Sequence, residues 1–158
     1  MEGGGAFHYG DWFYVNWVRD IPSVSSANIN VLELQSVLLS AKRWGHLWEG
    51  RHILVHSDNV STVACINKST SRSSDMMFLI KELFWCAVRF NFKLTAAYLP
   101  GKLNVVSDRI SRLHEVQCAN EACVLLFDGV NFPISCKSHM SESAFSALQE
   151  AWRPVYRL

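Results

Sequence analysis

Short runs of β-branched and aromatic residues alternate with segments of helical periodicity through residues 1–113, and this order limits the fold to the mixed α/β class. Two aromatic runs at 5–9 and 11–18 are separated by the turn signal Tyr9-Gly10-Asp11, which predicts a hairpin. The remaining segments are expected to be strands at 52–57 and 93–99, and helices at 34–48, 60–67, 76–88 and 105–113.

Composition favours one globular domain. Of the 158 residues 49% are hydrophobic, which is enough to bury a single core, so a second complete domain is not expected. We place the domain at 1–113 and interpret 114–158 as a linker or tail with one helix at 141–152. The net charge of +1 neither supports nor excludes a polynucleotide substrate. An apolar run long enough to span a bilayer and a signal peptide are both missing, so an intracellular protein without membrane contact is expected.

The cysteines predict no disulfide framework. There are five, an odd number, and Cys65 and Cys86 fall within apolar helical patterns, which favours reduced, buried thiols. A tetrahedral zinc site is a weaker alternative, because its spacing fits no common pattern and apolar residues intervene. Its ligands would be Cys118, Cys123, Cys136 and His139.

Three carboxylates occupy positions where a metal site could form. Glu33 is expected in the first turn of a helix, Asp58 at the carboxyl end of a strand, and Asp108 within the last helix. Hard divalent cations take oxygen ligands that converge from different elements, so the arrangement is compatible with Mg²⁺.

Each carboxylate also has a purely structural explanation. Asn30 and Glu33 have the spacing of a capping box, Asp58 could cap the following helix, and Asp108 could be a solvated helix residue. A serine hydrolase triad at His56-Ser57-Asp58 is not expected, because adjacent strand residues point to opposite faces and the sequence has no glycine-flanked nucleophile elbow.

Three segments carry a resemblance to a known family, and they occur in the family's order. They are 30–34 (Asn-Val-Leu-Glu-Leu), 55–59 (Val-His-Ser-Asp-Asn) and 99–112, which begins Leu-Pro-Gly-Lys-Leu-Asn. With its surroundings from Gly3 to Arg112, the sequence resembles the type 1 ribonuclease H domain of retrotransposon polyproteins, especially DIRS-like elements that carry a tyrosine recombinase. The resemblance implies a ribonuclease H-like mixed sheet flanked by helices.

The resemblance also implies a chemistry for the three carboxylates. Glu33, Asp58 and Asp108 match residues that hold Mg²⁺, with Mn²⁺ as a substitute, in enzymes that hydrolyse the RNA strand of RNA–DNA hybrids. Two such ions, about 3.5–4 Å apart, activate water and stabilise the leaving oxygen. We therefore expect these residues to be both metal ligands and catalytic residues.

Four further residues match supporting positions of the family. By resemblance, Asn30 reaches the minor groove, where 2′-hydroxyls distinguish RNA from DNA, and Asn59 is similarly placed. Asn104 would brace the metal site. Tyr98 stands where many cellular members have a histidine that assists proton transfer or product release, and some retroelement members share the tyrosine.

The family's first strand, which supplies a fourth aspartate, has no counterpart ahead of residues 5–9. That strand would lie at the centre of a five-stranded sheet, between 5–9 and 52–57, so its absence would remove structure and a metal ligand together. Two interpretations stay open: an impaired metal-dependent nuclease, or a non-catalytic remnant that binds nucleic acid or a polyprotein partner. The expected partners are an RNA–DNA hybrid and the reverse transcriptase and recombinase regions of the parent polyprotein. Residues 141–158 faintly resemble the start of that recombinase region.

Overall fold

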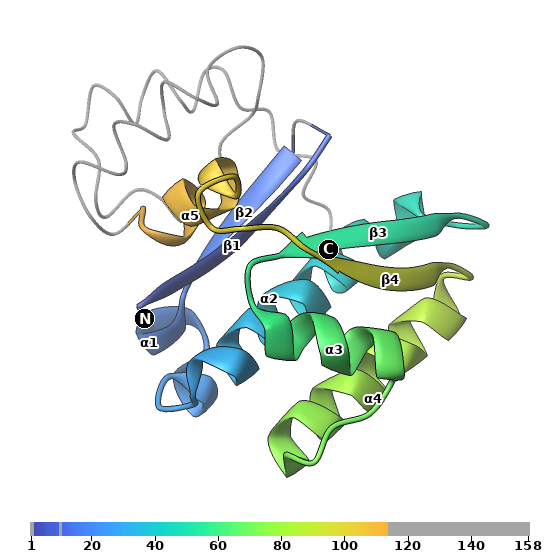
Figure 1. Cartoon of the computed structure of the whole chain (residues 1–158), viewed down its shortest axis with the longest axis horizontal. Coiled ribbons are helices and arrows are strands. Elements are labelled where there is room, and N and C mark those ends of the chain that lie inside the picture. Colours follow the sequence, from blue (N-terminus) through green and yellow to red (C-terminus); the bar gives the residue numbers. More distant parts are fainter. Residues whose placement is uncertain (1, 10, 114–158) are drawn as a thin grey trace. The chain divides into compact units, whose positions relative to one another are not determined.

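The structure, a computed structural model, describes residues 2–9 and 11–113 and shows a chain of the mixed α/β class (Figure 1). Two compact units make up the chain. Of the described residues, unit 1 comprises 2–9, 11–26 and 105–113, and unit 2 comprises 27–104. The tail helix expected at 141–152 and the alternative zinc ligands lie outside the described residues.

The hairpin predicted at the start of the chain is present in unit 1. Strands β1 (Gly3–His8) and β2 (Asp11–Asn16) pair antiparallel, from Gly3 opposite Asn16 to His8 opposite Asp11. The second strand ends two residues earlier than expected, because Asn16 caps the short helix α1 (Trp17–Asp20) by accepting a hydrogen bond from the Arg19 N–H (3.0 Å). The 3₁₀ turn η1 (Pro22–Val24) follows.

Helix α5 (Val105–Ser111) packs against β1, and the glycines of β1 make that contact possible. A Cβ on Gly5 would overlap the Cγ2 atom of Ile110 and lie 2.7 Å from the Phe13 carbonyl oxygen. Ile110 is completely buried. The glycine run at the start of the chain therefore forms the surface on which a helix is seated.

Unit 2 contains the three long helices and the 3₁₀ turn η2 (Gly45–Leu47). Helix α2 begins two residues earlier than the capping-box pattern predicts, because Asn28 is its N-cap and accepts from the Val31 N–H (3.2 Å). The expectation that Asn30 caps this helix and that Glu33 lies in its first turn is therefore wrong. The helices are α2 (Ile29–Trp44), α3 (Val60–Lys68) and α4 (Ser74–Arg89).

The sheet of unit 2 consists of β3 (His52–Ser57) and β4 (Lys93–Tyr98), as the sequence predicts to within a residue. The strands are parallel, with His52 opposite Lys93 and Ser57 opposite Tyr98, so both end at the same edge. Helices α2, α3 and α4 lie on one side of this sheet (Figure 1).

The free side of β4 is held by a side chain of α3. Asn67 donates from Nδ2 to the carbonyl oxygen of Ala96 and accepts at Oδ1 from the N–H of Ala96, both at 2.8 Å. In a parallel pair, alternate residues direct their backbone groups away from the neighbouring strand, and Ala96 is such a residue. Asn67 thus satisfies both polar groups of a buried backbone position.

Each of the two sheets has two strands, and none of the strands in residues 2–9 and 11–113 joins them into one sheet. The ribonuclease H-like five-stranded arrangement with its central strand stays a prediction. What the structure shows is the coarser statement, an α/β chain with an antiparallel pair and a parallel pair.

Tryptophans fill the core at four of the positions that the structure describes. Trp12, Trp17, Trp44 and Trp48 are buried, whereas Trp85 is exposed. Of the cysteines in the described part of the chain, Cys65 and Cys86 are free thiols and only half-buried. In that same part, the helices are all too short or too polar to cross a membrane.

Candidate functional site

The site of unit 2 begins where β3 ends. Asp58 directly follows Ser57, and its side chain is exposed. The Ser57 carbonyl oxygen accepts from the Leu99 N–H (2.9 Å), which continues the pairing of the two strands one residue past β4. Asp58 therefore stands at the carboxyl edge of a parallel pair, the position at which α/β sheets place ligand-binding groups.

Asn30 and Asn59, the two residues expected to contact substrate, are joined by a hydrogen bond. Asn59 Nδ2 donates to Asn30 Oδ1 at 2.8 Å. A second link comes from the fully buried Thr62, whose hydroxyl donates to the Asn30 carbonyl oxygen at 3.5 Å. The first turn of α2 is thus fixed to the first turn of α3, beside Asp58.

Asn59 has a structural role as well. It is the N-cap of α3, where its Oδ1 accepts from the Thr62 N–H (2.9 Å), and its own N–H donates to the Ser57 hydroxyl (3.1 Å). Both polar atoms of the Asn59 carboxamide therefore form hydrogen bonds: Oδ1 caps α3, and Nδ2 donates to Asn30. This ties the orientation of both amides to the end of β3.

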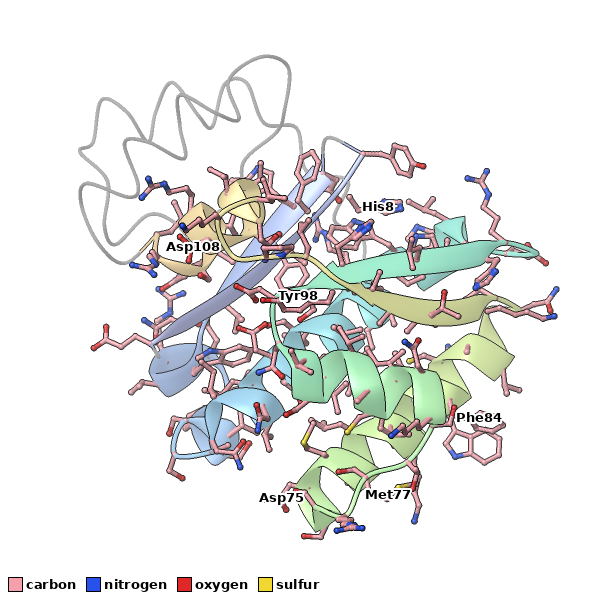
Figure 2. The ribbon with its side chains drawn as sticks, viewed as in Figure 1. His8, Asp75, Met77, Phe84, Tyr98 and Asp108 are labelled. Atoms are coloured by element: carbon pink, nitrogen blue, oxygen red, sulfur yellow. The ribbon has the colours of Figure 1, made fainter. Side chains whose placement is uncertain are left out.

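The turn after β4 approaches the same carboxylate. A Cβ on Gly101 would lie 3.3 Å from Asp58 Oδ2, so the absence of a side chain leaves clearance there. The turn is closed by hydrogen bonds from the Asn104 N–H to the carbonyl oxygens of Pro100 (3.2 Å) and Gly101 (3.1 Å). Tyr98, at the end of β4, is exposed in the same unit (Figure 2).

Two of the three expected metal ligands belong to unit 2. Glu33 lies in α2 and is half-buried, on the helix whose first turn carries Asn30. Asp58 follows β3. Both are oxygen donors of the kind that Mg²⁺ takes.

The third expected ligand, Asp108, belongs to unit 1. It lies in α5 and is half-buried, and its Oδ1 accepts from Arg112 Nε (3.2 Å), one helical turn further on. Among the residues that the structure describes, no group of three or more His, Cys, Asp or Glu side chains is gathered for a metal ion. Convergence of Glu33, Asp58 and Asp108 stays a prediction, and so does the bracing role of Asn104.

Sequence reasoning missed three residues that shape this edge. Thr62 and Ser57 are buried polar residues bonded to Asn30 and Asn59, and Gly101 provides the clearance at Asp58. The signal was available for Gly101, because glycine beside a strand end often marks a close approach by another group. Thr62 had no such signal, since it resembles any helix residue.

Comparison of the chain with protein-family models, with curated proteins and with solved structures finds no match.

Proposed function

We propose that this chain is a ribonuclease H-related domain whose reaction is metal-dependent hydrolysis of the RNA strand in an RNA–DNA hybrid. The observation that carries the proposal is the edge of unit 2. There, Asp58 follows a parallel strand and lies beside the bonded pair Asn30 and Asn59, with a glycine turn leaving room at its carboxylate. The three sequence motifs that resemble the family supply these residues.

The donor chemistry fits a divalent metal. Asp58 and Glu33 of unit 2 offer the carboxylate oxygens that Mg²⁺ or Mn²⁺ takes. When bound, such an ion supplies a water of lowered pKa and charge stabilisation at the scissile phosphate. Glycine at position 101 keeps the approach to Asp58 Oδ2 open, which a larger residue would narrow.

The asparagine pair would bind and orient the hybrid. Asn59 uses its Nδ2 on Asn30, which holds the Asn30 amide in one orientation. The Nδ2 group of Asn30 makes no hydrogen bond within the described residues, so it is a donor that a 2′-hydroxyl in the minor groove can accept from. A DNA strand lacks that hydroxyl, so the pair would favour RNA over DNA.

The test is cleavage of a labelled RNA–DNA hybrid in Mg²⁺ or Mn²⁺ by the full chain. Only three of the family's four carboxylates have counterparts in the 158 residues, so we expect slow cleavage. Asp58→Asn keeps the shape but removes a charged ligand and should lower the rate by about 100-fold or more. Asp75→Asn, at an exposed acid on α4, is the matched control and should leave the rate unchanged.

Two outcomes would contradict the proposal. Cleavage that survives Asp58→Asn would exclude Asp58 as a ligand. Binding of the hybrid without any metal-dependent cleavage would favour the second interpretation, a non-catalytic domain that holds nucleic acid. In that case Asn30→Ala should weaken binding to the hybrid more than binding to the matching DNA duplex.

A further inference from the structure

Helix α4 carries two apolar faces, and only one of them is covered. The buried face consists of Met76, Leu79, Ile80 and Leu83, and α4 packs against α2. The opposite face is exposed, with exposed fractions of 62% at Phe78, 59% at Phe84, 63% at Trp85 and 54% at Val88. Figure 2 shows Met77 and Phe84 on the side of α4 that points away from the β3–β4 sheet.

The exposed face has the spacing of a helix–helix seam. Phe78, Lys81, Trp85 and Val88 follow one another at intervals of three, four and three residues, which places them in one stripe along α4. Such a stripe matches the a and d positions of a heptad pattern. Large apolar side chains gathered on one exposed face, opposite a face that is already buried, are suited to a partner.

The stripe is complementary to itself when two copies run antiparallel. Pairing residues whose numbers sum to 166 sets Phe78 opposite Val88 of the second copy, and Lys81 opposite Trp85. The only charged side chain in the stripe, Lys81, then meets the aromatic face that attracts an ammonium group most strongly. In a parallel pairing, Lys81 would instead face its own copy, with like charges together.

We propose that the exposed face of α4 is a homodimer interface in which two α4 helices pack antiparallel across a twofold axis. The pairing is isologous, so each contact occurs twice. A 16-residue helix is about 24 Å long, and one such pair buries less than the roughly 800 Å² per partner of a standard stable interface. The dimer is therefore weak, with dissociation constants on the order of tens to hundreds of micromolar.

Sedimentation velocity of the full chain over a concentration series tests the interface. We expect the weight-average mass to rise toward that of a dimer over this range. Trp85→Glu should weaken association at least tenfold, and Lys81→Gln about fivefold, because each lost contact counts twice. Val18→Glu is the matched control, since Val18 is 63% exposed, as Trp85 is, but lies in α1. Circular dichroism verifies that the variants are folded.

Cysteine cross-linking tests the orientation. In a background with the native cysteines replaced by serine, Phe78→Cys and Val88→Cys proteins are mixed and oxidised. The antiparallel pairing predicts a disulfide between the two different variants, because positions 78 and 88 then face each other, whereas like positions lie too far apart. Disulfides between like variants would contradict the antiparallel arrangement.

Two further results would overturn the proposal. One is a chain that stays monomeric at all concentrations. If deleting residues 114–158 then speeds amide exchange in α4, the exposed face is covered by the chain's own tail and not by a second copy. The other is a dimer that persists unchanged in Trp85→Glu.

Discussion

Breaking the amide pair of Asn30 and Asn59 should reveal a coupling between α2 and α3 that can be measured as a free energy. Asn59→Ser keeps a side chain that caps α3 but cannot reach Asn30, so it removes only the 2.8 Å hydrogen bond. Asn30→Ala removes the same bond from the other side. The two changes together lose that one interaction only once.

The magnitudes follow from the contacts. A neutral hydrogen bond contributes about 1 kcal/mol, and both side chains are half-buried, so we expect Asn59→Ser to cost roughly 0.5–1 kcal/mol of unfolding free energy. Asn30→Ala should cost less, because alanine favours the helix by about 0.5 kcal/mol. Asn59→Ala loses the cap as well and should cost about 2 kcal/mol.

Urea denaturation followed by circular dichroism gives these values for the parent, both single variants and the double variant. The double variant should be less destabilised than the sum of the singles by roughly 0.5–1 kcal/mol. Additivity to within about 0.3 kcal/mol would refute the reasoning, because it would mean that the two amides do not interact in solution.

Two more predictions concern unit 1. Gly5→Ala should lower the unfolding free energy by about 1–3 kcal/mol, seen as a lower urea midpoint, because the added Cβ presses on Ile110; an unchanged midpoint would contradict the packing of α5 on β1. The side-chain hydrogen bond from Arg19 (2.6 Å) lowers the pKa of Asp20 from 3.8 despite partial burial, with help from the Asn16 N–H. The lowered pKa of Asp20 stabilises the folded state fully above pH 3.8, and this stabilisation is lost as pH falls through the folded-state pKa. Asp20→Asn should therefore be less stable than the parent at pH 7, by under about 1 kcal/mol for this exposed pair, and the difference should shrink as pH falls below 3.8. A pH-independent difference would contradict this assignment.

Turn and cap residues at the ends of the segments made most of the helices and strands predictable. β3 lies between the glycine turn before His52 and the Asp58-Asn59 pair, and it was found with its observed ends, 52 and 57. The start of α2 was placed wrongly, because Asn28 and Asn30 are both good caps two residues apart and local sequence does not decide between them.

The features that depend on tertiary packing could not be predicted from the sequence. The helix expected at 76–88 is present as α4, but helical periodicity does not say which side chains meet the core, and Trp85 and Val88 lie on the exposed face. The candidate site was predictable where it is local, as at Asp58 and Asn59. Convergence of Glu33 and Asp108 depends on how chain segments far apart in sequence fold together, which no local pattern encodes.

The carboxamide of Asn67 acts as a neighbouring strand one residue long. By occupying both backbone groups of Ala96, it closes the middle of β4 to any strand from outside. His52, Leu54 and His56 on β3 alternate with the residues that face β4, so they direct their backbone groups to the opposite edge. The sheet can therefore be extended in one direction only, and a strand added to it, whether native or from an aggregating neighbour, has its place beside β3.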